Sequence, residues 1–157
     1  MKNETTIYLR FEKSLPKGTA QQKGECIKTK SYIDYSGKLR KRQYIHHFTK
    51  RAVSEARKEY QLKLKPYLPK KPSDKPIKLT IIFYSSIKAP RSAWGTYKTT
   101  RPDLDNMAKE LIDAMIADKE TKRGGFFLDD AQIVDLRLMK YYAEQATIYI
   151  RIEEVEP

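Results

Sequence analysis

Residues 101–117 read RPDLDNMAKELIDAMIA, and this stretch combines a helical pattern with a cluster of carboxylates. Its apolar side chains recur at helical spacing and form one broad face: Leu104, Met107, Ala108, Leu111, Ile112 and Met115. Asp105, Lys109 and Asp113 follow one another at four-residue intervals on the other side. The pattern predicts an amphipathic helix from about Leu104 to Ala117, with Asp103 and Asp105 at its start.

A second acidic pair, Asp129 and Asp130, lies just before a predicted strand and after the apolar residues 126–128. The two acidic clusters occur in a chain whose formal net charge is +12. Carboxylates that gather repel one another unless a cation or a proton lies between them. Several carboxylate oxygens suit the hard cations Mg²⁺ and Mn²⁺. The two clusters together therefore predict a metal site.

The first cluster also has a purely structural explanation. Asp103 is at a position where an aspartate commonly caps a helix, and Asp105 and Lys109 are correctly spaced for an ion pair. On this alternative, Lys109 neutralises Asp105 and Asp113. The second cluster favours the metal site, because it lies just before a predicted strand, where the chain can be held in the sheet while a carboxylate points into a cleft.

Composition indicates one domain that binds nucleic acid. The chain has 157 residues, with 32 Lys and Arg against 20 Asp and Glu. Such a basic balance is typical of proteins that neutralise phosphates. Cys26 is the single cysteine, and the sequence has neither a signal-peptide pattern nor a long apolar run. We therefore expect a cytoplasmic, soluble protein that does not bind a membrane.

Alternating and helical patterns predict an α+β fold, in which two principal helices cover a small mixed β-sheet. Strands are expected at 5–11, 77–84, 132–141 and 146–153, with 77–84 central in the sheet. The last two are expected to pair with each other in antiparallel fashion, with Val134, Leu136 and Leu138 pointing inward. A further helix is expected at 49–64. Residues 1–157 would form a single domain.

Residues 12–44 are expected to form a basic insertion in this domain. It begins with a loop from Glu12 to about Gly24 and continues as a hairpin that turns at Ser36-Gly37. Tyrosines alternate with cations there, which suits base stacking and phosphate contact, although a solvated strand pair would show the same pattern. Clustering and nearness to the acidic residues select the expected DNA contacts: Lys38, Arg40, Lys41, Arg42, Lys98 and Arg101.

Carboxylates that hold a metal on a basic protein favour metal-assisted phosphodiester hydrolysis. Lys109 lies one helical turn after Asp105 and would point towards the same site. Its predicted role is to stabilise negative charge on the attacked phosphate or on the leaving oxygen.

The order PDLDN at 102–106, Lys109, Asp113 and then DDAQIV at 129–134 resembles the signature of the RusA-type Holliday junction resolvases. The resemblance implies a homodimeric endonuclease of phages and bacteria that nicks four-way DNA junctions symmetrically in recombination and repair. It implies Mg²⁺ or Mn²⁺ as the cofactor, with no small-molecule cofactor. By the same resemblance Asp103, Asp105 and Asp130 would bind the metal and Lys109 would be catalytic. Asp113 and Asp129 are possible supporting residues.

Two alternatives remain open at this point. The chain could be a non-catalytic nucleic-acid-binding protein, or it could be a less selective nuclease of branched DNA.

Overall fold

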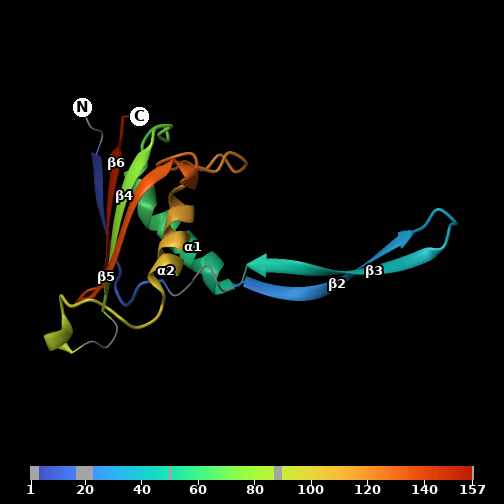
Figure 1. Cartoon of the computed structure of the whole chain (residues 1–157), viewed down its shortest axis with the longest axis horizontal. Coiled ribbons are helices and arrows are strands. Elements are labelled where there is room, and N and C mark those ends of the chain that lie inside the picture. Colours follow the sequence, from blue (N-terminus) through green and yellow to red (C-terminus); the bar gives the residue numbers. More distant parts are fainter. Residues whose placement is uncertain (1–3, 17–22, 50, 87–89, 157) are drawn as a thin grey trace.

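The computed structural model describes residues 4–16, 23–49, 51–86 and 90–156. Its centre is a four-stranded sheet in the order β1-β6-β4-β5 (Figure 1). The strands are β1 (Glu4–Arg10), β4 (Ile77–Ser85), β5 (Ile133–Tyr142) and β6 (Thr147–Glu154). The α+β class predicted from the sequence is confirmed.

Strand β4 is central, as predicted, but the expected pairing of the last two strands is wrong. β6 pairs antiparallel with both β1 and β4, whereas β5 pairs only with β4, in parallel. Apolar content explains the order. Both β4 and β6 bury every second side chain, while β5 carries Asp135 and Arg137 on an exposed surface. The more apolar strands take the interior of the sheet and leave β5 at its edge.

The inward orientation predicted for two residues of β5 is also wrong. Val134 is 62% exposed and Leu136 is 45% exposed, and only Leu138 packs against the core. The pairing with β4 shifts between Ile133 and Asp135, so Val134 has no partner there. An irregularity of this kind breaks the alternation from which inward and outward residues are predicted.

Both predicted helices are present, and they lie on the same side of the sheet (Figure 1). They are α1 (Arg51–Leu64) and α2 (Leu104–Met115), and they pack against each other. Tyr60 and Leu64 of α1 and Leu111 and Met115 of α2 are almost fully buried. The core therefore lies between this helix pair and the sheet. The described residues also form three short 3₁₀ helices: η1 (Lys65–Tyr67), η2 (Arg91–Ala93) and η3 (Asp130–Gln132).

A separate two-stranded hairpin projects away from the sheet (Figure 1). It consists of β2 (Lys23–Ile33) and β3 (Leu39–Thr49), so the predicted hairpin with its turn at Ser36-Gly37 is confirmed. Gly37 has a φ of +76°, a conformation that glycine adopts without strain. Residues 17–22 of the predicted basic loop lie outside the described residues, and residues 23 and 24 belong to β2.

Asp34 organises the hairpin turn. Its Oδ1 accepts hydrogen bonds from the backbone N–H and the hydroxyl of Ser36 and from the N–H of Lys38, while its Oδ2 accepts one from Arg40 Nε at 2.9 Å. These bonds, the Ser36 hydroxyl first and the Arg40 guanidinium second, lower the pKa of Asp34 to about 2. The turn is therefore stabilised by the ionised form of this carboxylate.

The turn is expected to respond to acid in a defined window. Because the folded pKa is lowered, the stabilisation is fully present above 3.8, the ordinary value, and is lost as the pH falls through about 2. NMR shifts of the Ser36 and Lys38 amides should follow this titration, and Asp34→Asn should abolish it. A midpoint near the ordinary value would contradict the bonded turn.

Candidate functional site

Asp103 occupies the N-cap position of α2, but its carboxylate does not cap the helix. The backbone there is extended, with φ −69° and ψ 143°, and the side chain makes no capping hydrogen bond. Only the carbonyl oxygen of Asp103 takes part, accepting from the N–H of Met107 at 3.1 Å. The carboxylate is exposed, so the structural explanation for an aspartate at this position does not account for it.

Asp105 and Lys109 lie on the exposed side of α2, one turn apart. Among the described residues neither side chain has an ion pair or hydrogen bond, so the alternative in which Lys109 neutralises Asp105 is not what the structure contains. The carboxylates of Asp103 and Asp105 and the ammonium group of Lys109 are thus exposed to solvent at the N-terminal half of α2. Such groups are available to a ligand without first breaking an internal contact.

The loop before Asp103 is held in place by two lysines. The Nζ of Lys98 donates to the carbonyls of Thr100 and Arg101 at 2.9 and 2.6 Å and to the Thr100 hydroxyl at 2.7 Å. Lys140, on β5, donates to the carbonyls of Thr100 and Pro102 at 2.9 and 2.8 Å. Because both ammonium groups bind carbonyl oxygens of this loop, they fix the path of the chain into α2.

Lys98 is therefore a correction to the predicted DNA contacts. It is only 4% exposed, and burial first, with the neighbouring Lys140 ammonium second, lowers its pKa. A lysine placed in this way positions the loop and does not present its charge to a phosphate. No feature of the linear sequence separates it from the surface lysines around it.

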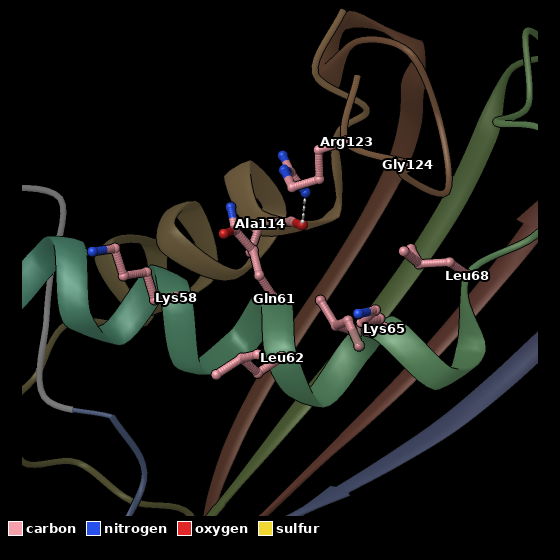
Figure 2. A pocket seen from close by; sticks show the side chains of 9 residues that line it. Lys58, Gln61, Leu62, Lys65, Leu68, Ala114, Arg123 and Gly124 are labelled. Atoms are coloured by element: carbon pink, nitrogen blue, oxygen red, sulfur yellow. Dashed lines mark hydrogen bonds between the residues drawn. The ribbon is translucent and has the colours of Figure 1, made fainter. Parts of the chain in front are cut away.

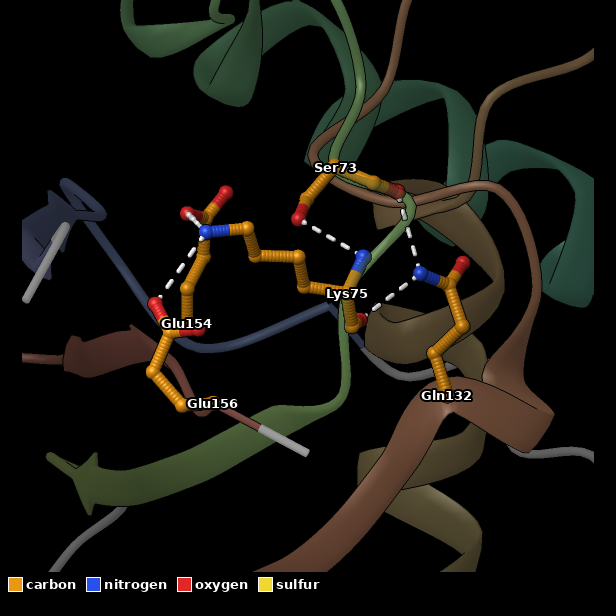
Figure 3. Close-up of polar contacts among 5 residues, drawn as sticks. All are labelled: Ser73, Lys75, Gln132, Glu154 and Glu156. Atoms are coloured by element: carbon orange, nitrogen blue, oxygen red, sulfur yellow. Dashed lines mark hydrogen bonds and ion pairs between the residues drawn. The ribbon is translucent and has the colours of Figure 1, made fainter.

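The second acidic cluster lies at the start of the short helix η3, which a capping box holds. Asp129 Oδ1 accepts from the N–H of Ala131 at 2.8 Å, and Gln132 Oε1 accepts from the N–H groups of Leu128 and Asp129. The amide of Gln132 then donates to the carbonyls of Ser73 and Lys75 at 3.0 and 2.9 Å (Figure 3). Asp129 supports the backbone, whereas the exposed Asp130 carboxylate has no partner among the described residues.

Within one chain the two acidic clusters are apart, so the predicted metal set of Asp103, Asp105 and Asp130 stays a prediction. Asp103 precedes α2, beside Lys140 near the end of β5. Asp130 directly precedes β5, and the nearby Phe126 N–H donates to the carbonyl of Met115 at the other end of α2. In Figure 1 the yellow segment before α2 and the orange segment before β5 lie at opposite ends of the sheet.

The donor chemistry fits a hard cation, although the described residues contain no closed cluster. No group of three or more His, Cys, Asp or Glu side chains converges to hold a metal ion in the part of the chain that the structure describes. The exposed, unpaired oxygens of Asp103 and Asp105 are nonetheless the ligand type that Mg²⁺ takes in combination with water and substrate phosphate. One chain thus presents a partial set of ligands.

Asp113, predicted as a supporting residue, is bound elsewhere. Its Oδ2 accepts from Arg57 Nη2 at 2.8 Å, and the same guanidinium binds Glu110 Oε2 at 2.9 Å. Glu110 is 2% exposed, and sequence reasoning did not single it out. Because the carboxylate is buried, Arg57 balances its charge and joins α1 to α2. Asp113 therefore contributes to the packing of α1 against α2.

The remaining predicted DNA contacts are exposed. Four of them lie in the hairpin or its turn, at Lys38, Arg40, Lys41 and Arg42, and Arg101 lies beside Asp103. The guanidinium of Arg40 is also used in the turn, by Asp34. A concavity of about 650 Å³ on the hairpin is lined by Lys30, Tyr32, Arg42 and Tyr44. Cations and tyrosines share this surface, as the sequence pattern suggested.

A groove of about 510 Å³ lies between α1 and the turn that follows α2, and none of the predicted site residues lines it (Figure 2). Lys58, Lys65 and Arg123 are among the residues that line it. Arg123 donates to the carbonyls of Ala114 and Ile116 at 2.9 and 2.6 Å, which satisfies the end of α2.

None of the described helices is long and apolar enough to cross a membrane.

We expect Gln132→Leu to displace Asp130 without unfolding the chain. The substitution removes the acceptor for two N–H groups and the donor to two carbonyls, at a cost of about 1–3 kcal/mol. Urea unfolding measures this loss, and amide hydrogen exchange at Leu128 and Asp129, whose N–H groups lose their acceptor, should be faster in the variant. Equal exchange rates in Gln132→Leu and the parent protein would mean that Gln132 does not hold η3 in place.

Comparisons with known proteins identify the family of this chain. A family model described as endodeoxyribonuclease RusA matches residues 34–153, which include both acidic clusters. The chain is 42% identical over 80 residues to a crossover junction endodeoxyribonuclease rusA of Lactococcus phage r1t, covering 51% of this chain and 56% of the phage protein. It is 37% identical over 57 residues to the uncharacterized protein YqaN of Bacillus subtilis (strain 168), covering 36% of this chain and 35% of that protein.

These alignments span about half or less of the relatives' own length, whereas the family match covers most of this chain. The matched range contains α2, η3, the strands β3, β4 and β5, and β6 up to residue 153. The chain belongs to the RusA endodeoxyribonuclease family.

Proposed function

We propose that this protein is a metal-dependent endonuclease that resolves four-way DNA junctions by symmetric nicking. The observation that carries the proposal is the exposed set of Asp103, Asp105 and Lys109 on α2, unpaired among the described residues of a chain with net charge +12. Membership of the RusA family and a phage relative named as a crossover junction endodeoxyribonuclease support the choice of substrate.

The residues that would hold the cation are Asp103, Asp105 and Asp130, and the cation would be Mg²⁺ or Mn²⁺. When bound, it would supply an activated water and charge stabilisation at the phosphate. Asp103 and Asp105 are positioned by the loop that Lys98 and Lys140 hold, and Asp130 by the contacts of Gln132. The backbone that carries these carboxylates would thus be held in place before DNA arrives, which would reduce the reorganisation needed for the reaction.

DNA would be held largely by the basic hairpin. Arg42 and Lys30 face the same concavity as Tyr32 and Tyr44, so phosphate contact and base stacking are possible on one surface. Lys38, Lys41 and Arg101 would add phosphate contacts. Symmetric nicking requires two active sites, and a two-fold homodimer supplies them.

Cleavage of three substrates with shared sequence tests the proposal: a four-way junction, a flap and a plain duplex. With Mg²⁺ the junction should be nicked at symmetric positions on opposing strands, and the duplex should not be cut. Cutting of the flap at the same rate as the junction would instead identify a less selective nuclease of branched DNA. Junction binding without nicking of any substrate, with either cation, would identify a non-catalytic binding protein.

Lys109→Ala is expected to bind junctions with nearly the parent affinity and to cut them about 10²–10³-fold more slowly, the usual effect of removing one charge-stabilising group. The residue is exposed and unpaired among its described neighbours, so the fold should not change. Single-turnover rates and gel-shift affinities separate the two effects. Lys119→Ala, in an exposed turn, is the matched control; an equal loss in both variants would indicate a general effect of charge.

A further inference from the structure

The groove between α1 and the turn after α2 has an apolar floor (Figure 2). Leu64 and Ala114, which line it, are each only 1% exposed, and Leu68, which also lines it, packs against the core. Its volume of about 510 Å³ lies within the range of roughly 300–1,000 Å³ that ligand pockets occupy. Neither acidic cluster nor the basic hairpin contributes to the lining, so the groove is separate from the sites described above.

Beside this groove, α1 and its continuation η1 present a leucine between two cations. Lys58, Leu62 and Lys65 follow one another at intervals of four and three residues, a spacing that places them on one face of a helix. Leu62 is 72% exposed. Neither ammonium group has an ion pair or hydrogen bond among the described residues. An exposed apolar side chain beside an apolar recess is typical of a surface that another molecule covers.

The opposite wall of the groove is the turn 117–125, and its own contacts hold it in place. Asp118 Oδ2 accepts from the Thr121 hydroxyl at 2.6 Å, and the Asp118 N–H donates to the carbonyl of Arg123 at 2.9 Å. A side chain at Gly125 would overlap the backbone of Ala117, so the turn lies as close to the end of α2 as glycine allows. The groove is therefore formed before a ligand binds, which lowers the cost of binding.

The charges that line the groove are of one sign. The described residues of the lining include three cations, Lys58, Lys65 and Arg123, and no Asp or Glu. A negatively charged ligand is therefore favoured. A DNA strand would place phosphates beside the cations but would leave the apolar floor and Leu62 exposed to water. A peptide that carries a bulky apolar side chain between carboxylates matches both the charge and the floor.

We propose that this groove binds an acidic peptide segment of another protein. A bulky apolar side chain of the segment fills the recess against Leu62 and Leu68, and carboxylates on either side of it pair with the two lysines beside Leu62. Ala114 and Asp105 are nine residues apart on α2, about 14 Å along the helix axis, so the peptide does not occupy the space beside Asp105. The inference does not depend on the proposed function, because peptide binding needs neither the aspartates nor a cation.

Fluorescence anisotropy with two labelled peptides, DEDLFEELDE and DEDSSEESDE, tests the site in the absence of DNA and metal. The parent protein should bind the first at least about 10-fold more tightly than the second, the scale expected when an interface loses its apolar anchor. Leu62→Ser removes the exposed apolar contact, and Gly124→Leu fills the recess, because a Cβ atom at Gly124 would lie 3.6 Å from Leu68 Cδ1. Each change should weaken binding of the first peptide by about 10-fold.

The role of charge is tested in the same assay. The affinity of the parent for the first peptide should fall as the salt concentration rises. Lys58→Gln combined with Lys65→Gln should weaken binding and make it less sensitive to salt. Parent-like salt dependence in this double variant would overturn the pairing of carboxylates with these lysines.

Tyr67→Ser is the matched control for the loss of exposed apolar surface. Tyr67 is 44% exposed in η1 but is not among the described residues that line the groove. Parent-like binding by both Leu62→Ser and Gly124→Leu, or an equal loss in Tyr67→Ser, would overturn the proposal. Equal binding of the two peptides by the parent protein would also overturn it.

Two further measurements distinguish other occupants of the groove. Leu62→Ser should bind a labelled DNA duplex in EDTA as tightly as the parent, and an equal loss of duplex and peptide binding would identify a nucleic-acid site instead. Sedimentation of the same variant should match that of the parent, and a smaller species would identify a contact between two copies of the chain instead. A parent protein that binds the peptide but cuts no junction supports the groove and counts against the proposed function.

Discussion

Asp105→Asn is expected to reduce junction cleavage by about 10³-fold or more, the scale at which loss of a metal ligand or preorganised charge reduces catalysis. The side chain changes by one atom and keeps its shape, but it loses the negative charge that would hold Mg²⁺. Asp105 is exposed and has no partner among the described residues, so its replacement removes no internal contact. Stability should therefore remain within about 0.5 kcal/mol of the parent.

The affinity of Asp105→Asn for the junction should not fall, although its cleavage rate does. A carboxylate beside the scissile phosphate repels it when no cation is present, so Asp105→Asn should bind the junction in EDTA as tightly as the parent or more tightly. Glu59→Gln, which removes one exposed negative charge from α1, is the control for a general charge effect. Parent-like cleavage by Asp105→Asn at limiting Mg²⁺ would exclude this residue as a ligand.

Local patterns predicted the parts of the fold that depend on neighbouring residues. The apolar face of α2 and the strand alternation of β4 and β6 are set by side chains within one element, and burial follows them. Asp103 and Asp105 could likewise be selected, because their contrast with a basic chain is visible in the sequence. The hairpin turn at Ser36-Gly37 was predictable for the same reason.

Features that depend on distant residues were not predictable. β4 pairs with β6 along one edge and with β5 along the other, and β5 is the edge strand because β1 pairs with β6; no single strand carries that information. In the sequence, Lys98 cannot be told apart from a surface lysine. Only the folded loop places three oxygens within hydrogen-bond distance of its ammonium group. The separation of Asp130 from Asp103 follows from the parallel pairing of β4 with β5. The sequence patterns predicted an antiparallel pair of β5 and β6 instead, and this pairing does not imply the separation.

The second large effect is expected on stability, from breaking the ionic contact between α1 and α2. Arg57 donates from Nε and Nη2 to Glu110 Oε2 at 3.2 and 2.9 Å and from Nη2 to Asp113 Oδ2 at 2.8 Å. The Glu110 side chain is 2% exposed, whereas that of Arg57 is 37% exposed. Water thus reaches the guanidinium but hardly reaches the Glu110 carboxylate. Removing the arginine would leave a buried charge without its cation, which is the costly case.

Arg57→Met is therefore expected to lower the free energy of unfolding by about 3 kcal/mol, at the lower end of the range for a broken buried pair because the arginine is partly hydrated. Methionine keeps the aliphatic packing of the arginine stem, so the loss reports on charge. The double variant Arg57→Met with Glu110→Met should recover most of the stability, since both charges are gone. Urea unfolding of the three proteins measures this coupling. If the two single changes were additive in the double variant, the pair would not be the interaction that joins α1 to α2.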